Sequence, residues 1–312
     1  NDNSGIFQYV SIRHAGETYS GLAGNEVNGL TLGSVGRGTT IDHVEVIACD
    51  DDAFEMFGGT VNLKYLSAMF SNDDMFDWDL GYSGKMQFLF GVQADQAATP
   101  TADNGFEADT WDNSYTGASP KATPQIYNAT IIGNGAGTLT SDMSGKSGWR
   151  AKDGTQGLIQ NSIFSGWGTA INFTGADGGL VAGTAGSIGL HNTVLFASAT
   201  VQTPASPTIS TSNTTPATLA SFVANGGTLN CPVGSQSTFD FPAAAKFDPI
   251  PVPQSVTAAF LPPNDGFFKS AAYKGAFSTT EEPWLSGWSI SAFYGIQSGL
   301  SSQTVCPTDV NY

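Results

Sequence analysis

Two stretches, Asp51-Asp52-Ala53-Phe54-Glu55-Met56 and Asp73-Asp74-Met75-Phe76-Asp77-Trp78, repeat one phrase at an offset of 22 residues. A third copy reads Asp103-Asn104-Gly105-Phe106-Glu107-Ala108, and a degenerate fourth reads Ser147-Gly148-Trp149-Arg150-Ala151-Lys152. Each copy is a short strand with alternating apolar and polar residues, followed by a turn rich in Gly, Asp or Asn. Self-similarity at a fixed period indicates that one supersecondary unit repeats along the chain.

The length of the repeat decides what this unit is. Twenty-two residues are too few for a strand-helix-strand crossover. They fit one coil of a parallel β-helix, in which each coil stacks about 4.8 Å from the last. Two longer intervals between copies then become loops extruded from one corner, at residues 95–101 and 133–146. The sequence therefore predicts an all-β protein, a parallel β-helix with coils of about 22 residues.

Changes in composition divide the chain into three parts. Residues 1–195 carry the repeats and are predicted to form the β-helix. Residues 196–263 are rich in Ser, Thr, Pro and Ala, which indicates a linker or an extended loop region. Residues 264–312 regain aromatic side chains and are predicted to pack on or cap the solenoid, because such a stack needs an end cover.

The overall charge excludes several partners. The 312 residues include 27 acidic and 11 basic side chains, for a net charge of −16. Nucleic acid and anionic lipid are therefore not expected partners. No apolar run is long enough to span a bilayer, so no membrane span is predicted.

Three cysteines and three glycosylation motifs bear on the compartment. Cys231 and Cys306 both lie in turn-like contexts before a proline, and we predict a disulfide between them, which leaves Cys49 as a free, buried thiol. A disulfide would fit a secreted protein. The acceptor pattern for N-glycosylation occurs at Asn128, Asn172 and Asn213.

The repeat also predicts a row of acidic side chains. If Phe54, Phe76 and Phe106 point inward, the residues after them point outward, and so do the residues two positions further on. Stacked carboxylates repel one another unless they are solvated or bridged by a cation, and Ca²⁺ suits such a set of oxygens. The candidate metal ligands are Glu55, Asp77, Asp79, Glu107 and Asp109. The alternative is an acidic, solubilising surface.

Two basic residues, Arg150 and Lys152, close this row, either as counter-charges or as participants in chemistry. The arrangement is similar to that of polysaccharide lyases built on parallel β-helices. The resemblance implies a uronate bound through Ca²⁺ and an Arg or Lys that abstracts the proton α to the carboxylate.

The stretch from Asp51 to Asn62, DDAFEMFGGTVN, resembles a signature of secreted, largely uncharacterised β-helix proteins of Bacteroidota-type bacteria. The segment from Asn25 to Leu32 resembles an upstream strand of that family, and Gly275-Ala276-Phe277 with Trp284-Leu285-Ser286-Gly287-Trp288 resembles its closing segment. The resemblance implies a right-handed parallel β-helix outside the cell, but it carries no established activity.

Three functional hypotheses follow. In that family further strands usually precede the point where this chain begins, so we expect an uncovered first coil, which would template another strand. The leading hypothesis is therefore an extracellular structural protein, a homopolymer that stacks into a filament or matrix. The first alternative is a Ca²⁺-dependent, lyase-like enzyme on acidic polysaccharides. The second is a carbohydrate-binding or adhesive module that uses exposed aromatic residues such as Trp111, Tyr115 or Trp167.

Overall fold

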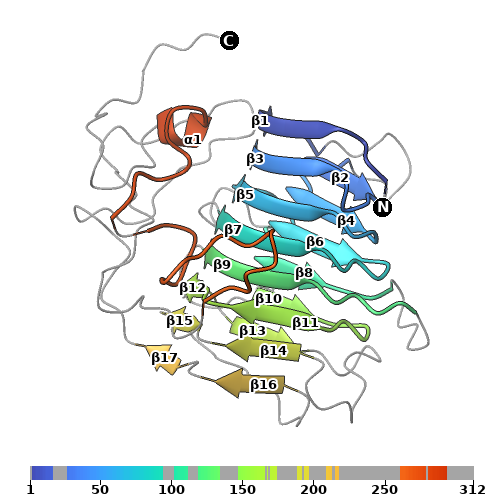
Figure 1. The fold of residues 1–312 in the computed structure, drawn as a ribbon, viewed down its shortest axis with the longest axis vertical. Helices are drawn as coiled ribbons and strands as arrows, with labels where there is room; N and C mark the ends of the chain where they lie inside the picture. The colour runs from blue at the N-terminus through green and yellow to red at the C-terminus, as the bar shows by residue number, and fades with distance from the viewer. Residues whose placement is uncertain are drawn as a thin grey trace.

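The computed structural model contains a parallel β-helix, as the repeat predicts (Figure 1). It describes residues 2–16, 27–93, 102–111, 119–133, 147–165, 167, 169–173, 188–191, 193–196, 209–212, 215–217, 261–278 and 280–293. The predicted loops 95–101 and 133–146 lie outside these ranges, apart from residue 133. Within the described residues, no helix has the length and apolar character needed to cross a membrane.

Two parallel sheets form the walls of the coil. The longer strands pair in the order β1-β3-β5-β7-β9-β11-β14-β16, with β12 continuing the pairing beside β9 and followed by β15 and β17; we call this set sheet A. Its strands are β1 (Ile6–Arg13), β3 (Thr40–Ile47), β5 (Asn62–Met69), β7 (Lys85–Val92), β9 (Gln125–Ile132), β11 (Gly157–Gln160), β12 (Ile163–Ser165), β14 (Ile188–His191), β15 (Val194–Phe196), β16 (Ile209–Ser212) and β17 (Thr215–Ala217).

The repeated phrase forms the second wall, which we call sheet B. Its strands pair in the order β2-β4-β6-β8-β10-β13. They are β2 (Leu30–Gly33), β4 (Phe54–Phe57), β6 (Phe76–Asp79), β8 (Phe106–Ala108), β10 (Ser147–Ala151) and β13 (Thr169–Phe173). Equivalent positions of the phrase are register partners in neighbouring strands, which confirms the predicted alignment of the copies.

A column of aromatic side chains fills the interior behind sheet B. Phe54, Phe76, Phe106 and Trp149 are register partners in successive strands, and all are buried. The ring centroids of Phe54 and Phe76 lie 5.2 Å apart, and those of Phe76 and Phe106 lie 5.5 Å apart. Burial of these side chains holds consecutive coils in register and fixes which residues of the phrase point outward.

Five successive long strands of sheet A each contain one residue with a left-handed backbone. In β1, β3, β5, β7 and β9 these residues are Tyr9, His43, Tyr65, Phe88 and Asn128, with φ between 51° and 60°, and Asn161, with φ 52°, follows between β11 and β12. A positive φ is costly for a residue with a side chain. Ring stacking offsets part of this cost, since the centroids of Tyr9 and His43 lie 4.6 Å apart and those of His43 and Tyr65 lie 4.4 Å apart.

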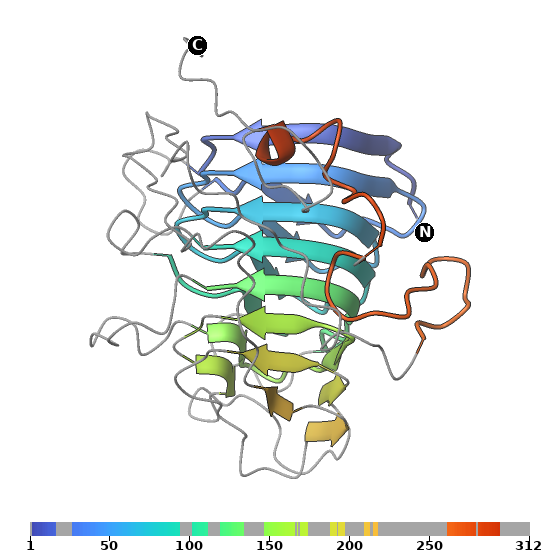
Figure 2. The ribbon, with the colours of Figure 1, turned by 90° about the vertical axis from the view of Figure 1, so that its left-hand side faces the viewer.

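The described part of the C-terminal segment, residues 261–278 and 280–293, packs along the side of the solenoid and does not cover an end. It lies along the long strands of sheet A (Figure 2) and includes the short helix α1 (Ile290–Phe293). We call it the strap. Its backbone hydrogen-bonds outward-facing side chains of strands β3, β7 and β9, namely Glu45, Gln87, Asn128 and Thr130.

The β-helix also extends further than expected. The repeats predict its end at residue 195, but β16 pairs with β14 and β17 pairs with β15. Residues 196–217 are rich in Ser, Thr and Pro, which indicates a linker. This composition gave no sign of the short strands β16 and β17, which join the stack.

Candidate functional site

The outward-facing residues of sheet B form one continuous row. Glu55, Asp77 and Glu107 are register partners in β4, β6 and β8. Thr31 precedes this run on β2, and Arg150 follows it on β10. The row predicted from the repeat is therefore present, with acidic side chains one coil apart.

A second ladder lies where the chain enters sheet B. The carboxylate of Asp52 accepts a hydrogen bond from the backbone N–H of Asp74, at 2.9 Å. The carboxylate of Asp74 accepts one from the N–H of Asn104, whose side-chain oxygen accepts one from the N–H of Ser147 at 2.9 Å. Each side chain thus connects one coil to the next, which explains why the carboxylates of Asp52 and Asp74 are buried.

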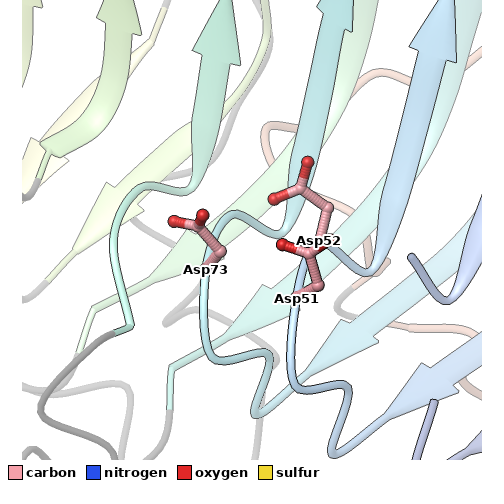
Figure 3. Close-up of side chains that lie close together, drawn as sticks. All are labelled: Asp51, Asp52 and Asp73. Atoms are coloured by element: carbon pink, nitrogen blue, oxygen red, sulfur yellow. The ribbon is translucent and has the colours of Figure 1, made fainter. Parts of the chain in front are cut away.

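Eight carboxylates lie close together here: five from the outward row and the ladder of Asp52 and Asp74, and three from the neighbouring residues Asp51, Asp73 and Asp103. Four groups of three have ligand oxygens within 4.8 Å of one another, and Figure 3 shows the first of them. The groups are Asp51, Asp52 and Asp73; Asp73, Asp74 and Asp103; Asp52, Glu55 and Asp77; and Asp74, Asp77 and Glu107. One coil further along, the second group repeats the arrangement of the first. In the same way, the fourth group repeats the arrangement of the third. We call the whole set the acidic cluster.

Burial and mutual repulsion oppose ionisation of these carboxylates. Burial, and then the charges of neighbouring acids, raise the pKa of Asp52, Asp74 and Asp77 well above the ordinary value. Burial also raises the pKa of Glu55 to about 7, although a hydrogen bond from Asn28 acts in the opposite direction. A bound cation would remove both penalties at once.

The donor set fits a hard divalent cation. Every ligand atom is a carboxylate oxygen, which is the type that Ca²⁺ prefers. Three carboxylates supply three to six oxygens, and Ca²⁺ accepts about six to eight, with water completing the shell. Asp77 belongs to two of the groups, and its buried Oδ1 has no hydrogen-bond partner. The residues present are therefore suited to Ca²⁺ on chemical grounds.

Arg150 and Lys152 lie against the end of the acidic cluster. The guanidinium Nη1 of Arg150 lies 2.9 Å from Glu107 Oε1. The amine of Lys152 lies 3.0 Å from Glu107 Oε2 and 3.2 Å from Asp109 Oδ2. Burial lowers the pKa of Lys152, but Glu107 and Asp109 outweigh it and raise the pKa above its ordinary value. Lys152 is therefore held protonated at neutral pH.

Comparison with protein families identifies the domain. Residues 1–237 match the family described as the pectate-lyase-like β-helix domain. The chain belongs to this family. Searches of curated proteins and of solved structures found no significant match.

In this pectate-lyase-like β-helix, three of the five predicted metal ligands belong to the acidic cluster. Glu55, Asp77 and Glu107 lie within it, but Asp79 and Asp109 are in none of the four groups. Asp109 pairs with Lys152 instead, and burial raises its pKa to about 7 although Lys152 acts in the opposite direction.

Five members of the acidic cluster were not predicted from the sequence. The acidic residues that open the first three copies of the phrase were a usable signal, because Asp51, Asp73 and Asp103 recur at the same offsets as the outward row. This signal indicates how the coils align, but not that these side chains join the row. The missed residues are Asp51, Asp52, Asp73, Asp74 and Asp103.

Of the remaining predictions, one is confirmed, some are wrong, and others concern residues outside the described ranges. Cys49 is free and buried, as predicted. Trp167 is buried, with its indole N–H donating to a backbone oxygen, so it is not an exposed aromatic residue. Trp111 is 47% exposed. Cys231, Cys306, Tyr115 and Asn213 lie outside the described residues.

The prediction that Asn128 carries a glycan is wrong for the folded chain. The side chain is fully buried, and its Nδ2 donates to the backbone oxygen of Tyr273 in the strap at 2.8 Å. A glycan on this nitrogen would displace the strap. Asn172 is also buried, at 7% exposure on β13, which disfavours a glycan there.

Proposed function

We propose that this protein acts on acidic polysaccharides as a Ca²⁺-dependent lyase, with the outer face of sheet B as its binding surface. The observation that carries the proposal is the register of β6, β8 and β10, which sets Arg150 directly beside carboxylates able to hold a cation. Membership in the pectate-lyase-like family supports the same conclusion. The proposal includes an extracellular location, where a protein meets polymers too large to enter a cell.

The carboxylates of the acidic cluster would hold the cation. Asp77 is the residue of the outward row that two groups share, and its buried Oδ1 has no hydrogen-bond partner. Bound Ca²⁺ would draw in a uronate carboxylate and make the proton α to it more acidic.

Arg150 is the candidate base of this site. Its side chain is 25% exposed and stands one strand beyond Glu107. In this elimination the base would take the proton α to the uronate carboxylate, the bond from the β carbon to the glycosidic oxygen would break, and the departing oxygen would take a proton from water. Arg150 must be neutral to act as the base, and its ion pair with Glu107 opposes this. Lys152 is less suited because its amine is paired with both Glu107 and Asp109. We assign Lys152 to the orientation of substrate carboxylates.

A second candidate function is binding without cleavage. The observation that favours it is the pairing of both basic residues with Glu107. If these ion pairs persist when the polymer binds, sheet B recognises an acidic glycan but does not break it. The filament role expected from the sequence draws no support from the family match and remains a prediction.

The test uses the purified chain with polygalacturonate and with alginate, in Ca²⁺ and in EDTA. The lyase proposal expects ultraviolet absorbance from an unsaturated product, in Ca²⁺ only. Asp77→Asn and Arg150→Ala should abolish it, whereas Arg37→Ala, an exposed arginine elsewhere, should not. Cation-dependent binding of either polymer without product supports the second candidate. No binding and no product on either polymer would refute both.

A further inference from the structure

Glu107 stands between an acid and a base in the outward row of sheet B. Register pairing places Asp77 beside it on β6 and Arg150 beside it on β10. Neighbouring strands lie about 4.8 Å apart, so the long side chain of a glutamate can lean toward either neighbour. In the structure it leans toward the base, since Arg150 Nη1 lies 2.9 Å from Glu107 Oε1.

Both carboxylate oxygens of Glu107 contact basic groups. Arg150 pairs with Oε1, and the amine of Lys152 lies 3.0 Å from Oε2. The three side chains are between 14% and 25% exposed, so salt screens these pairs less than it screens pairs on an open surface. A guanidinium and an amine would hold the carboxylate of a uronate in the same way. Glu107 therefore occupies the place that the carboxylate of an acidic polysaccharide would take.

The carboxylate of Glu107 also belongs to a group that could hold a cation. Its partners there are Asp74 and Asp77, and the ligand oxygens of the three lie within 4.8 Å of one another. A second observation points to a cation at this group: Oδ1 of Asp77 is buried and, among the described residues, has no hydrogen-bond partner. A buried acceptor without a donor is costly, and coordination of a cation would offset this cost.

These two roles of Glu107 exclude each other. A coordinated Ca²⁺ lies about 2.4 Å from its ligand oxygen. Each oxygen of Glu107 is 2.9 or 3.0 Å from a basic nitrogen, so the cation and that nitrogen would be at most about 5.4 Å apart. Like charges this close repel strongly where water is partly excluded. Lys152 would keep a partner, because its amine also lies 3.2 Å from Asp109 Oδ2. Coordination of a cation by Glu107 thus releases Arg150 from their ion pair.

We propose that Glu107 is a positioning residue under the control of a cation: it holds Arg150 in an ion pair until it turns to a divalent cation bound by the acidic cluster. This inference rests on the proposed function and removes the obstacle that the ion pair presents to Arg150 as a base. With Glu107 turned away, Arg150 and Lys152 face a uronate unit of the polymer. Without the cation, the chain keeps its own carboxylate in the place of the substrate's.

Chemical modification of Arg150 tests this switch without relying on catalysis. The chain has three arginines, so Arg13 and Arg37, which are exposed, serve as internal controls. Phenylglyoxal, which reacts with accessible guanidinium groups, is applied in Ca²⁺ and in EDTA, and mass spectrometry of peptides gives the rate at each arginine. Ca²⁺ should speed the reaction of Arg150 about fivefold, as expected when a partly exposed ion pair is lost, and should leave the controls unchanged.

Two variants separate the switch from a general effect of Ca²⁺. In Glu107→Gln, Arg150 should react as fast in EDTA as it does in wild type with Ca²⁺, because the ion pair is absent from the start. Glu55→Gln is the matched control, since Glu55 lies in the same outward row but outside the group of Glu107. It should keep the response of Arg150 to saturating Ca²⁺.

Calorimetric titration with Ca²⁺ gives a second readout, with melting temperatures to confirm folding. Glu107→Gln should bind Ca²⁺ about tenfold more weakly, because one charged ligand is lost. Arg150→Gln should bind it more tightly, because the competitor for Glu107 is gone, and this gain should vanish in the double variant. If saturating Ca²⁺ leaves the modification rate of Arg150 unchanged, the switch is refuted and the proposed function stands, with the cation on other carboxylates of the cluster. If the wild-type chain binds no Ca²⁺, the switch and the proposed function both fail.

Discussion

The carboxylate of Asp52 accepts a hydrogen bond at 2.9 Å from the backbone N–H of Asp74, the residue that occupies the same place one coil later. Both side chains are buried, so each carboxylate costs desolvation energy that a hydrogen bond to one N–H offsets only in part. In the next coil Asn104 makes the same contact to Ser147 with an amide oxygen and carries no charge. A ladder of this kind requires only an acceptor, which indicates that the charge of Asp52 and Asp74 serves another purpose.

Asp52→Asn should therefore keep or increase the stability of the metal-free chain. The amide oxygen retains the contact to Asp74, and the buried charge is removed. Asp52→Ala should cost about 1–3 kcal/mol, because it leaves a buried N–H without a partner. Urea unfolding in EDTA measures both. A loss of stability in Asp52→Asn as large as in Asp52→Ala would show that the negative charge itself supports the fold.

The sequence determined the register of sheet B but not its electrostatics. A repeat of 22 residues, with Phe54 and Phe76 inward, suffices to place Glu55 beside Asp77 because side chains alternate along a strand. The direction in which Asp52 and Asp74 point could not be derived in this way, since they lie in a turn. The pairing of Lys152 with Asp109 likewise depends on rotamers.

The position of the strap on sheet A also could not be predicted from the sequence. Its contacts with sheet A join residues more than 100 positions apart. For example, Glu45 accepts hydrogen bonds from backbone N–H groups of α1. Neither the repeat nor local composition carries information about such distant pairs. The aromatic residues of 264–312 indicated that this segment packs on the solenoid, but not on which face.

Ca²⁺ should stabilise the chain through the acidic cluster. A cation that binds only the folded state adds about 2.7 kcal/mol when its concentration is 100 times Kd. Asp77→Asn should reduce this gain, because it removes a carboxylate from two of the four groups of ligands. Thermal melts with Ca²⁺ and with EDTA measure the effect. Asp42→Asn, which removes a carboxylate on sheet A, is the matched control and should respond to Ca²⁺ as wild type does.

The metal-free chain should lose stability as pH rises from about 4 to about 7. Burial raises the pKa of Glu55 to about 7, so the folded chain retains a proton that the unfolded chain releases near pH 4. Because the folded state binds more protons across this range, unfolding becomes easier as pH increases, and the contribution of Glu55 levels off above pH 7. Glu55→Gln should flatten the slope. Urea midpoints at several pH values in EDTA provide the measurement, and equal slopes for the two proteins would contradict the assignment.

Glu45 should control the docking of the strap. Its carboxylate is fully buried and accepts hydrogen bonds from Ser11 Oγ at 2.8 Å and from the backbone N–H groups of Ile290 and Ser291, each at 3.0 Å. Glu45→Ala leaves these donors unpaired, which should cost about 2–4 kcal/mol and loosen residues 290–293. Glu45→Gln retains two acceptor lone pairs on one oxygen and should have a smaller effect.

Limited trypsin digestion measures how firmly the strap is held on sheet A, since the strap contains Lys269 and Lys274. Cleavage at these lysines should be faster in Glu45→Ala than in wild type, while the circular dichroism of the solenoid is unchanged. The loosening should also affect the aromatic stack, because the ring of Trp288 lies edge-on to His43 at 5.7 Å. Unchanged cleavage with unchanged stability would mean that the contacts of Gln87, Asn128 and Thr130 hold the strap without Glu45, since these lie on other strands and are independent of α1.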